Sequence, residues 1–321
     1  MTDPSEESSA FVAELNSAHR MSYDEFVALH QRLCTWGPDR EPDERGALAA
    51  ISAETVLRTL ALVDEGLSVS MARDLDTVAS ESNPQPTLHY MVELGDQQVP
   101  EPQAYRDFVG LEYHGRAVTH LDALCHMAFE GKYFGGVAAE EVMTTTGSTW
   151  GSARPTFDGV IARAVLVDLP RMVGGGCPMG TAVTPELLED LMAKVGLELR
   201  LGDALVLRSG ADADGPMGRA TVSQLASGLT PEAFVWAAER GVAILGSDTG
   251  NELRPPRVEG VKAPIHALSL TAAGVLLLDN LHLERFAEEC AARGRYEAAM
   301  VFAPLPIVGG TGSPLNPIAI F

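Results

Sequence analysis

The sequence predicts an α/β fold with a mixed β-sheet. Helical segments with clear start signals alternate along the chain with short apolar runs that have the length of buried strands. The chain has 321 residues, of which 46% are hydrophobic, and this is enough to bury a large core. We expect a single domain over residues 21–321, preceded by a flexible polar extension over residues 1–20.

The first two helices are predicted from serine residues that can cap them. Ser22 is followed three residues later by Glu25, a capping box that predicts a helix reaching about Leu33. Ser52 predicts a second helix, which would end at Gly66. We expect the inward face of this second helix to carry four apolar side chains, those of Val56, Leu57, Leu60 and Leu62.

Two later helices share one start signal, a capping threonine followed by proline at the first helical position. The signal occurs at Thr184-Pro185-Glu186 and again at Thr230-Pro231-Glu232. Gly196 and Gly241 indicate where the two helices end. Apolar runs between and after these helices predict buried strands at residues 164–169, 204–207, 242–245 and 275–278.

The chain is strongly acidic, with a net charge of −21 and a pI near 4.7. Phosphate backbones and anionic membranes would repel such a protein, so we expect neither nucleic acid nor a membrane as its partner. The first residues are polar and acidic, unlike a secretory signal, so we expect the protein in the cytoplasm. Its four cysteines include no C-x-x-C pair, which indicates reduced thiols and not a zinc finger.

Three of the eight histidines lie within thirteen residues, as His114, His120 and His126. In an extended backbone His120 and Asp122 share one face, where imidazole and carboxylate suit zinc or manganese. His126 would then carry protons as a general acid or base. Cys125 is not expected to act with His126, because adjacent strand residues face opposite sides. The alternative is that these are core and surface histidines satisfied by hydrogen bonds.

The run T-H-L-D-A-L-C-H at residues 119–126 resembles the signature of the cyclase family of metal-dependent hydrolases, whose members include bacterial kynurenine formamidase and isatin hydrolase. Further blocks are similar to the family at residues 202–210, 246–249, 264–266, 279–281 and 310–319. The resemblance covers the chain from about Trp36 to its end. It implies a barrel-like sheet flanked by helices, of the swivelling β/β/α type, a small-molecule substrate and a homodimer or higher homo-oligomer.

The resemblance also implies which residues hold the metal. Family formamidases have their first metal-binding histidine where this chain has Arg116, and a guanidinium cannot donate a lone pair to a metal. Either His114 replaces that ligand or the site holds its ion with fewer ligands. Arg116 could instead bind a substrate carboxylate.

The second ligand group that the family implies matches His266 and Asp279, and we expect Asp248 of the D-T segment to contact substrate. Without the resemblance, His266 would be interpreted as a core or rim histidine. Asp279 would be interpreted as the N-cap of a helix over residues 281–293.

The predicted function is hydrolysis of an amide, lactam or lactone-like bond in a small cyclic or aromatic metabolite, using divalent zinc or manganese. One alternative is a lyase or cyclase that uses the same ion as a Lewis acid, losing water or closing a ring. The other is a metabolite-binding protein without activity, in which Arg116 marks a degenerate metal site.

Overall fold

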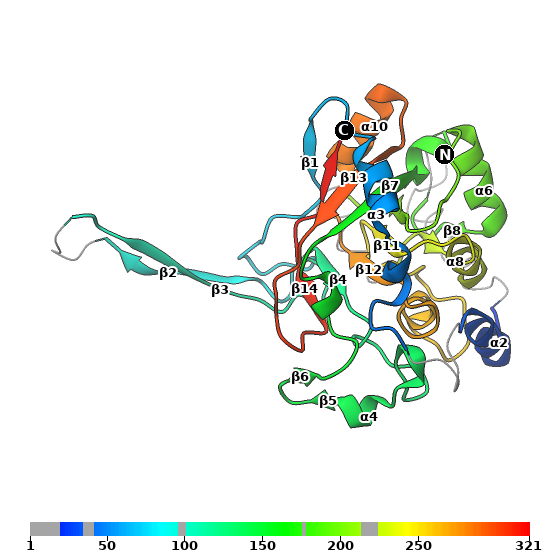
Figure 1. Cartoon of the computed structure of the whole chain (residues 1–321), viewed down its shortest axis with the longest axis horizontal. Helices are drawn as coiled ribbons and strands as arrows, with labels where there is room; N and C mark the ends of the chain where they lie inside the picture. The colour runs from blue at the N-terminus through cyan, green and yellow to red at the C-terminus, as the bar shows by residue number, and fades with distance from the viewer. Residues whose placement is uncertain (1–19, 35–41, 96–100, 175–177, 213–223) are drawn as a thin grey trace, which may run out of the picture.

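The structure, a computed structural model, describes residues 20–34, 42–95, 101–174, 178–212 and 224–321. The extension predicted over residues 1–20 lies outside the described residues except for Arg20. A curled half-barrel sheet forms the centre of the molecule, and helices flank it (Figure 1). This confirms the predicted fold class.

Nine strands form this sheet within the described residues, in the order β1-β15-β13-β7-β9-β11-β12-β4-β14. Its four central strands, β7, β9, β11 and β12, are parallel, and the strands on both sides of them pair antiparallel. The strand bounds are β1 Ser68–Ser70, β4 His120–Asp122, β7 Val160–Asp168, β9 Ala204–Arg208, β11 Ile244–Ser247, β12 Leu276–Asp279, β13 Glu297–Phe302, β14 Gly312–Pro314 and β15 Ile318–Ile320.

The four predicted strands are the four parallel ones. Their ends are shifted by one or two residues, except that β7 begins four residues earlier than predicted. Every residue of β9, β11 and β12 is buried, which explains why these strands are continuous apolar runs without alternation. The carboxyl ends of β11 and β12 carry polar residues, among them Asp279, the last residue of β12. The candidate site forms at this end of the sheet.

Three predicted helices are confirmed with their caps. In α2 (Tyr23–Leu33), the Ser22 hydroxyl accepts a hydrogen bond from the Glu25 amide, and the Glu25 carboxylate accepts one from the Ser22 amide. In α6 (Pro185–Lys194) and α8 (Pro231–Ala238), the threonine before the proline accepts a hydrogen bond at 3.3 Å from the amide three residues later. The caps satisfy amides that a helix start leaves without partners.

The helix predicted after Ser52 is α3 (Ala53–Leu60), which ends six residues before Gly66. The predicted inward face is wrong for Leu57 and Leu60, which are 68% and 40% exposed, whereas Thr59 is buried. The other two residues predicted to face inward, Val56 and Leu62, are half-buried. The helix packs on β7 and β13 through a different stripe of its surface. Residues three apart share a helix face, and a short helix with apolar residues on two stripes does not reveal which stripe is inside.

The remaining elements are short or lie outside the central sheet. α10 (Glu284–Arg293) contacts β1, and α9 (Pro264–His266) runs directly into a π-helix, η4 (Ala267–Ala273). An antiparallel hairpin of β2 (Leu88–Leu94) and β3 (Tyr105–Gly110) projects away from the body (Figure 1). The others are η1 Gly46–Ala50, η2 Phe134–Gly136, α4 Ala139–Val142, β5 Met143–Thr144, β6 Gly147–Ser148, η3 Arg154–Thr156, α5 Leu169–Met172, β8 Ala182–Val183 and β10 Gly228–Leu229.

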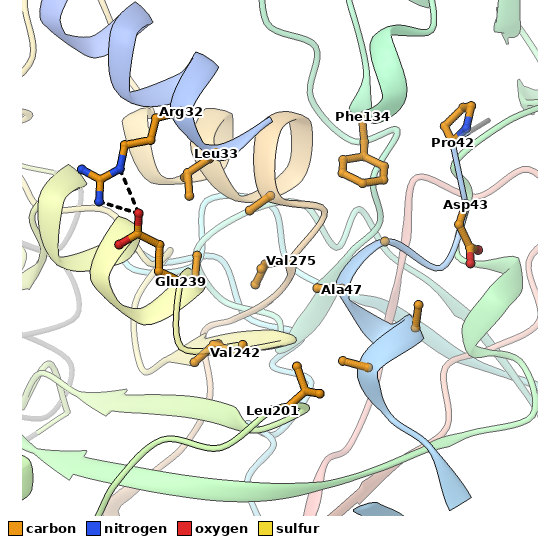
Figure 2. A pocket seen from close by; sticks show the side chains of 16 residues that line it. Arg32, Leu33, Pro42, Asp43, Ala47, Phe134, Leu201, Glu239, Val242 and Val275 are labelled. Atoms are coloured by element: carbon orange, nitrogen blue, oxygen red, sulfur yellow. Dashed lines mark hydrogen bonds and ion pairs between the residues drawn. The ribbon is translucent and has the colours of Figure 1, made fainter. Parts of the chain in front are cut away.

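A cavity lies away from the candidate site. A cavity of about 480 Å³ lies at the amino ends of the parallel strands, walled by apolar side chains such as Phe134, Val242 and Val275 and by the Arg32–Glu239 ion pair (Figure 2). It is therefore at the opposite end of the sheet from Asp279.

Within the described ranges, no helix is both long enough and apolar enough to cross a membrane.

Candidate metal centre

Strand β4 places His120 and Asp122 on one face of the sheet, as predicted. Side chains alternate along a strand, so Leu121 between them points the other way and is fully buried in the core. His120 pairs in register with Asp279 of β12, and Asp122 with Gly312 of β14. The Nε2 atom of His120 lies 3.4 Å from Oδ1 of Asp122. The local sequence thus creates half of the site.

The other half comes from residues more than 140 positions further along the chain. His266, on α9, brings its Nε2 to 3.4 Å from Oδ2 of Asp122 and to 3.6 Å from Oδ2 of Asp279. Asp279 ends strand β12, and α10 begins only at Glu284, so the alternative that Asp279 is a helix N-cap is wrong. The structure therefore brings His266 and Asp279 to Asp122.

His114 also reaches this cluster. Its Nδ1 lies 2.8 Å from Oδ1 of Asp122, and its ring stacks on that of His126 at a centroid distance of 3.9 Å. Arg116 is exposed and lines a different space, a cavity of about 280 Å³ that it shares with Arg73 and other polar residues. The geometry therefore favours His114 as the replacement for the ligand that Arg116 cannot supply.

Three polar atoms of the cluster are buried without a hydrogen-bond partner, namely Nδ1 of His114 and both carboxylate oxygens of Asp122. The 2.8 Å contact between His114 and Asp122 does not have hydrogen-bond geometry. A buried carboxylate without donors is costly, yet carboxylate oxygens and imidazole nitrogens are atom types that can bind a metal ion. The arrangement fits a divalent cation better than a closed hydrogen-bond network.

Each of the three nearest imidazoles is held through its other ring nitrogen. Nδ1 of His120 lies 2.8 Å from the Val118 carbonyl oxygen, and Nδ1 of His266 lies 2.8 Å from Oε1 of Glu252. Nε2 of His114 lies 2.8 Å from the Thr311 hydroxyl. A histidine that donates from one nitrogen keeps a lone pair on the other, which here faces Asp122.

Two sets of possible ligand atoms share Asp122. One set is His120, Asp122 and Asp279, and the other is His114, Asp122 and His126, with the ligand atoms of each set within 4.8 Å of one another. Nitrogen and oxygen donors of this kind suit zinc or manganese. His126 is thus placed where it could serve as a ligand as well as a proton carrier, and its catalytic role stays a prediction.

Electrostatics within the cluster favour opposite charges on its carboxylate and imidazoles. Burial would raise the pKa of Asp122, but the close contacts with His114, His120 and His266 outweigh burial and hold that pKa well below its usual range. Burial would lower the pKa of His120, but Asp122 and Asp279 outweigh it and raise the pKa to about 9. In the metal-free protein, protons on the imidazoles therefore take the place of a cation.

The pKa values of His266 and His126 shift in opposite directions. Burial opposes the charged form of His266, but Asp122, Asp279 and Glu252 raise its pKa well above the usual range. His126 is 3.9 Å from Oδ2 of Asp122, and burial lowers its pKa to about 4. His126 is therefore a neutral imidazole at neutral pH, able to accept a proton.

These shifts predict how pH controls metal-induced stability. The folded pKa of His120 is about 9, above the value near 6.5 of an unfolded imidazole. Its stabilising contribution to the metal-free protein is full below about pH 6.5 and is lost as the pH rises through about 9. A metal binds the deprotonated ring. We expect the rise in Tm on adding zinc or manganese to grow from about pH 6 to about pH 8.5, as measured by thermal unfolding with and without metal. A rise that is independent of pH would contradict this.

Several supporting residues were not identified from the sequence. Glu252 is buried and accepts hydrogen bonds from both the backbone amide and the ring of His266, at 2.9 and 2.8 Å. Asn251 donates to Oδ1 of Asp279 at 2.6 Å. Both lie just after the D-T segment. The one feature of the sequence that could have identified Glu252 is that it is a carboxylate within a buried stretch. Thr311 lies within the block at residues 310–319 that resembles the family, but nothing in that block indicated a contact with His114.

Removing such a support is expected to weaken metal binding without abolishing it. Glu252→Gln keeps the size of the side chain but removes the charge that polarises His266, and Thr311→Val removes the hydroxyl beside His114. Substitutions of this kind typically cost about 10–100-fold in metal affinity. Competition with a chelator measures the change, with Thr311→Ser as the control that retains the hydroxyl. Equal affinities for Thr311→Val and Thr311→Ser would show that the hydroxyl has no role.

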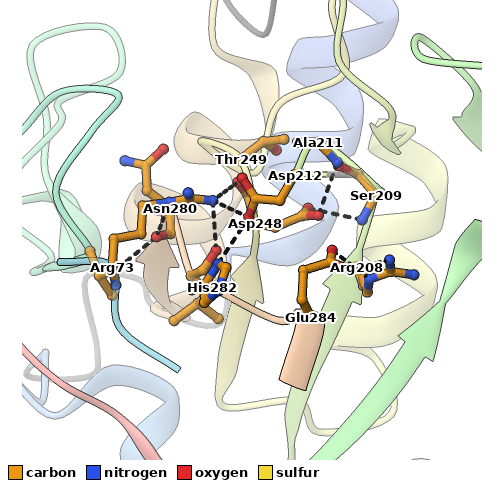
Figure 3. Close-up of polar contacts among 12 residues, drawn as sticks. Arg73, Arg208, Ser209, Ala211, Asp212, Asp248, Thr249, Asn280, His282 and Glu284 are labelled. Carbon is orange, nitrogen blue, oxygen red and sulfur yellow. Dashed lines mark hydrogen bonds and ion pairs between the residues drawn. The ribbon is translucent and has the colours of Figure 1, made fainter. Parts of the chain in front are cut away.

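Asp248 has a supporting position in the structure. It is fully buried, and its carboxylate accepts hydrogen bonds from the amides of Ser209, Gly210 and Ala211 at 2.8, 3.0 and 3.2 Å (Figure 3). These bonds fix the turn after β9. The contact with substrate expected for Asp248 stays a prediction, and it would require the carboxylate to exchange these bonds.

The same region ties the site to the rest of the fold. Arg73 pairs with Asp212 at 2.5 Å and donates to the carbonyl oxygen of Asn280 at 3.0 Å (Figure 3). The side-chain amide of Asn280 in turn donates to the carbonyl oxygen of Gly115 at 2.7 Å. The backbone carbonyl oxygen of Asn280 accepts a hydrogen bond from the Thr119 hydroxyl at 2.6 Å. These bonds hold the segment between His114 and His120 in place.

Cys125 lies in a turn that follows β4, so the predicted reason for excluding a thiol nucleophile is wrong. Burial nevertheless raises the pKa of its thiol to about 11. The thiolate needed for nucleophilic attack is therefore scarce at neutral pH.

Comparison with known proteins supports this description of the fold. The family model described as a putative cyclase matches residues 53–251. A crystal structure described as a novel cyclase is similar over 90% of this chain and 99% of its own, with a TM-score of 0.80 and 29% identity. The comparison with curated proteins gives no match.

Isatin hydrolases share the fold at lower identity. One, bound to the product analogue thioisatinate, covers 84% of this chain and 98% of its own, with a TM-score of 0.55 and 19% identity. Isatin hydrolase A from Ralstonia solanacearum covers 79% and 91%, with a TM-score of 0.55 and 21% identity. Because the family model spans more than half of the sequence, the chain belongs to the putative cyclase family.

Proposed function

We propose that this protein is a metal-dependent hydrolase that opens an amide, lactam or lactone-like bond in a small cyclic or aromatic metabolite. The observation that carries the proposal is the buried Asp122, whose two oxygens have no hydrogen-bond donor and face imidazole nitrogens. Hydrolases among the proteins of similar fold support a hydrolytic reaction.

Five residues would hold the ion, which we propose to be zinc or manganese: His114, His120, Asp122, His266 and Asp279. When bound, such an ion polarises a carbonyl group and lowers the pKa of water from 15.7 to about 7. The chain's own contribution is to fix the donor atoms. Glu252 and Thr311 set which nitrogen of His266 and of His114 faces the ion.

His126 is proposed to move the proton. Burial keeps its ring neutral at neutral pH, because its pKa is about 4, so it can accept a proton from water and return it to the leaving nitrogen or oxygen. Arg116 is proposed to bind a carboxylate of the substrate from the cavity of about 280 Å³ that it lines.

His126→Ala tests this division of labour. We expect the variant to keep its metal and to lose about 100–10,000-fold in kcat, the usual contribution of a general acid or base. His120→Ala is the matched comparison, expected to lose metal and activity together. Loss of metal from His126→Ala would instead make His126 a ligand, and unchanged turnover would remove it from the reaction.

The substrate class is tested by a screen of N-formyl aromatics, cyclic imides, isatins and lactones on protein of known metal content. Reactions in oxygen-18 water distinguish hydrolysis, which places the label in the product, from a lyase or cyclase reaction, which does not. Protein purified without chelator that contains far less than one metal ion per chain would favour the metabolite-binding alternative.

A further inference from the structure

The two carboxylate oxygens of Asp279 have different surroundings. Oδ1 accepts a hydrogen bond at 2.6 Å from the side-chain amide of Asn251. Oδ2 lies 3.6 Å from Nε2 of His266. Asp279 and Asn251 are only 5% and 4% exposed, so little water competes for these contacts. One oxygen of Asp279 is thus bound by the chain itself, and the other faces the candidate metal centre.

The contacts of Asn251 determine which of its side-chain atoms faces Asp279. The same nitrogen, Nδ2, also donates a hydrogen bond to the Leu278 carbonyl oxygen at 3.1 Å. Both partners are oxygen acceptors, so the NH₂ group of the asparagine is the end that satisfies them. Both of its hydrogens are used, and Asn251 cannot turn away without leaving a buried acceptor unpaired.

The backbone around Asn251 is also fixed in this position. Asn251 has a φ of 54°, a left-handed conformation that asparagine adopts more readily than most residues. Just before it in the chain, the carbonyl oxygen of Thr249 accepts a hydrogen bond at 2.8 Å from the amide of Asn280. The turn that carries Asn251 is therefore held against the segment that carries Asp279.

The residue between Thr249 and Asn251 leaves the second oxygen uncovered. A Cβ atom at Gly250 would lie 3.2 Å from Oδ2 of Asp279, closer than an ordinary van der Waals contact. A side chain at this position would therefore crowd the oxygen that faces the centre. The pair Gly250-Asn251 thus covers one oxygen of Asp279 and leaves the other accessible.

Metal ions differ in how many carboxylate oxygens they use. Zinc in proteins usually has about four ligands, whereas manganese favours about six, most of them oxygen. A carboxylate that can offer both of its oxygens therefore helps manganese more than it helps zinc. Asp279 can offer only one oxygen while Asn251 holds the other.

We propose that Asn251 is a positioning residue that shifts the metal preference of the candidate centre toward zinc and away from manganese. It does so by holding Oδ1 of Asp279, so that this ligand contributes Oδ2 alone. The inference rests on the proposed function, because it takes the metal centre as given, and it names the ion that the centre prefers. Zinc binds most nitrogen and oxygen sites more tightly than manganese, so the effect of Asn251 lies in the size of the preference and not in its direction.

Asn251→Gly tests the proposal, because it removes the amide and places at this position a residue that adopts positive φ without strain. Competition with a chelator measures the dissociation constants of zinc and of manganese on the metal-free full chain. We expect the preference for zinc, which is the ratio of the two constants, to fall about 10-fold or more, as is usual for a residue that orients a metal ligand. An equal loss of affinity for both ions would indicate a merely structural role and would overturn the proposal.

Glu130→Gly is the matched control for the new glycine. Glu130 also has a positive φ, of 49°, but it is exposed, and its carboxylate accepts a hydrogen bond from the Tyr23 hydroxyl at 3.0 Å. The control should keep the zinc preference of the unmodified protein. A fall in the control as large as that in Asn251→Gly would also contradict a specific role for Asn251.

Asn251→Asp decides the question if the glycine variant does not fold. It keeps the size of the side chain but replaces the NH₂ group by an oxygen, so Oδ1 of Asp279 loses its donor and gains an oxygen neighbour. We expect the preference for zinc to fall at least as far as in Asn251→Gly, and an unchanged preference would overturn the proposal. If the unmodified protein bound neither ion, the proposed metal centre would fall as well, whereas metal binding with an unchanged preference in the variants would refute the role of Asn251 alone.

Discussion

Asp122→Asn is expected to remove the metal from the protein and with it the activity. Asp122 belongs to both sets of ligand atoms, and it is the residue against which His114, His120 and His266 all lie within 3.4 Å. The substitution keeps the size of the side chain but replaces one oxygen by an NH₂ group, which cannot bind a cation. If a zinc-binding free energy of about 10–16 kcal/mol is shared among the five proposed ligands, each contributes about 2–3 kcal/mol, and the loss is on the order of 100-fold in affinity.

Metal content after purification without chelator, followed by titration against a competing chelator, measures the effect. Asp43→Asn is a matched control, since Asp43 is an exposed carboxylate paired with Arg45. The control should retain the full metal content of the unmodified protein. Full metal content in Asp122→Asn would refute the assignment of the centre, whatever happened to the activity.

The parts of the site that were predicted correctly depend on local geometry. That His120 and Asp122 share a face follows from the two-residue period of a strand, which any extended segment obeys. The buried parallel strands were also visible, because a strand covered on both faces is a continuous apolar run. His266 and Asp279 were implied by resemblance alone, and the structure brings both to Asp122.

The parts that could not be predicted depend on packing between distant segments. Thr311 lies 197 residues from His114 in the chain, and nothing near Thr311 indicates a contact with a histidine. The position of Glu252 beside His266 likewise follows from how the segment after β11 turns back toward α9. The inward face predicted for α3 was wrong at Leu57 and Leu60 for the same reason, since the sheet decides which of two apolar stripes is buried.

Gly312 shows how closely the last segment of the chain is packed against the centre. A Cβ atom at Gly312 would lie 2.0 Å from the carbonyl oxygen of Leu121 and 3.0 Å from Cε1 of His114. Leu121 is in β4, whose pairing with β14 sets the position of Asp122. Even a methyl group therefore has to push the two strands apart, and the ring of His114 with them.

Gly312→Ala is accordingly expected to destabilise the protein by about 2–3 kcal/mol, the usual cost of overpacking, and to weaken metal binding at the same time. Urea denaturation and chelator competition measure the two effects separately. Gly115→Ala is the control, because a Cβ at Gly115 meets nothing within 4 Å, and it should leave stability within about 0.5 kcal/mol. If Gly312→Ala matched Gly115→Ala in both measurements, the two strands would have to be free to separate, and the close seating of His114 against Asp122 could not be what positions the metal ligands.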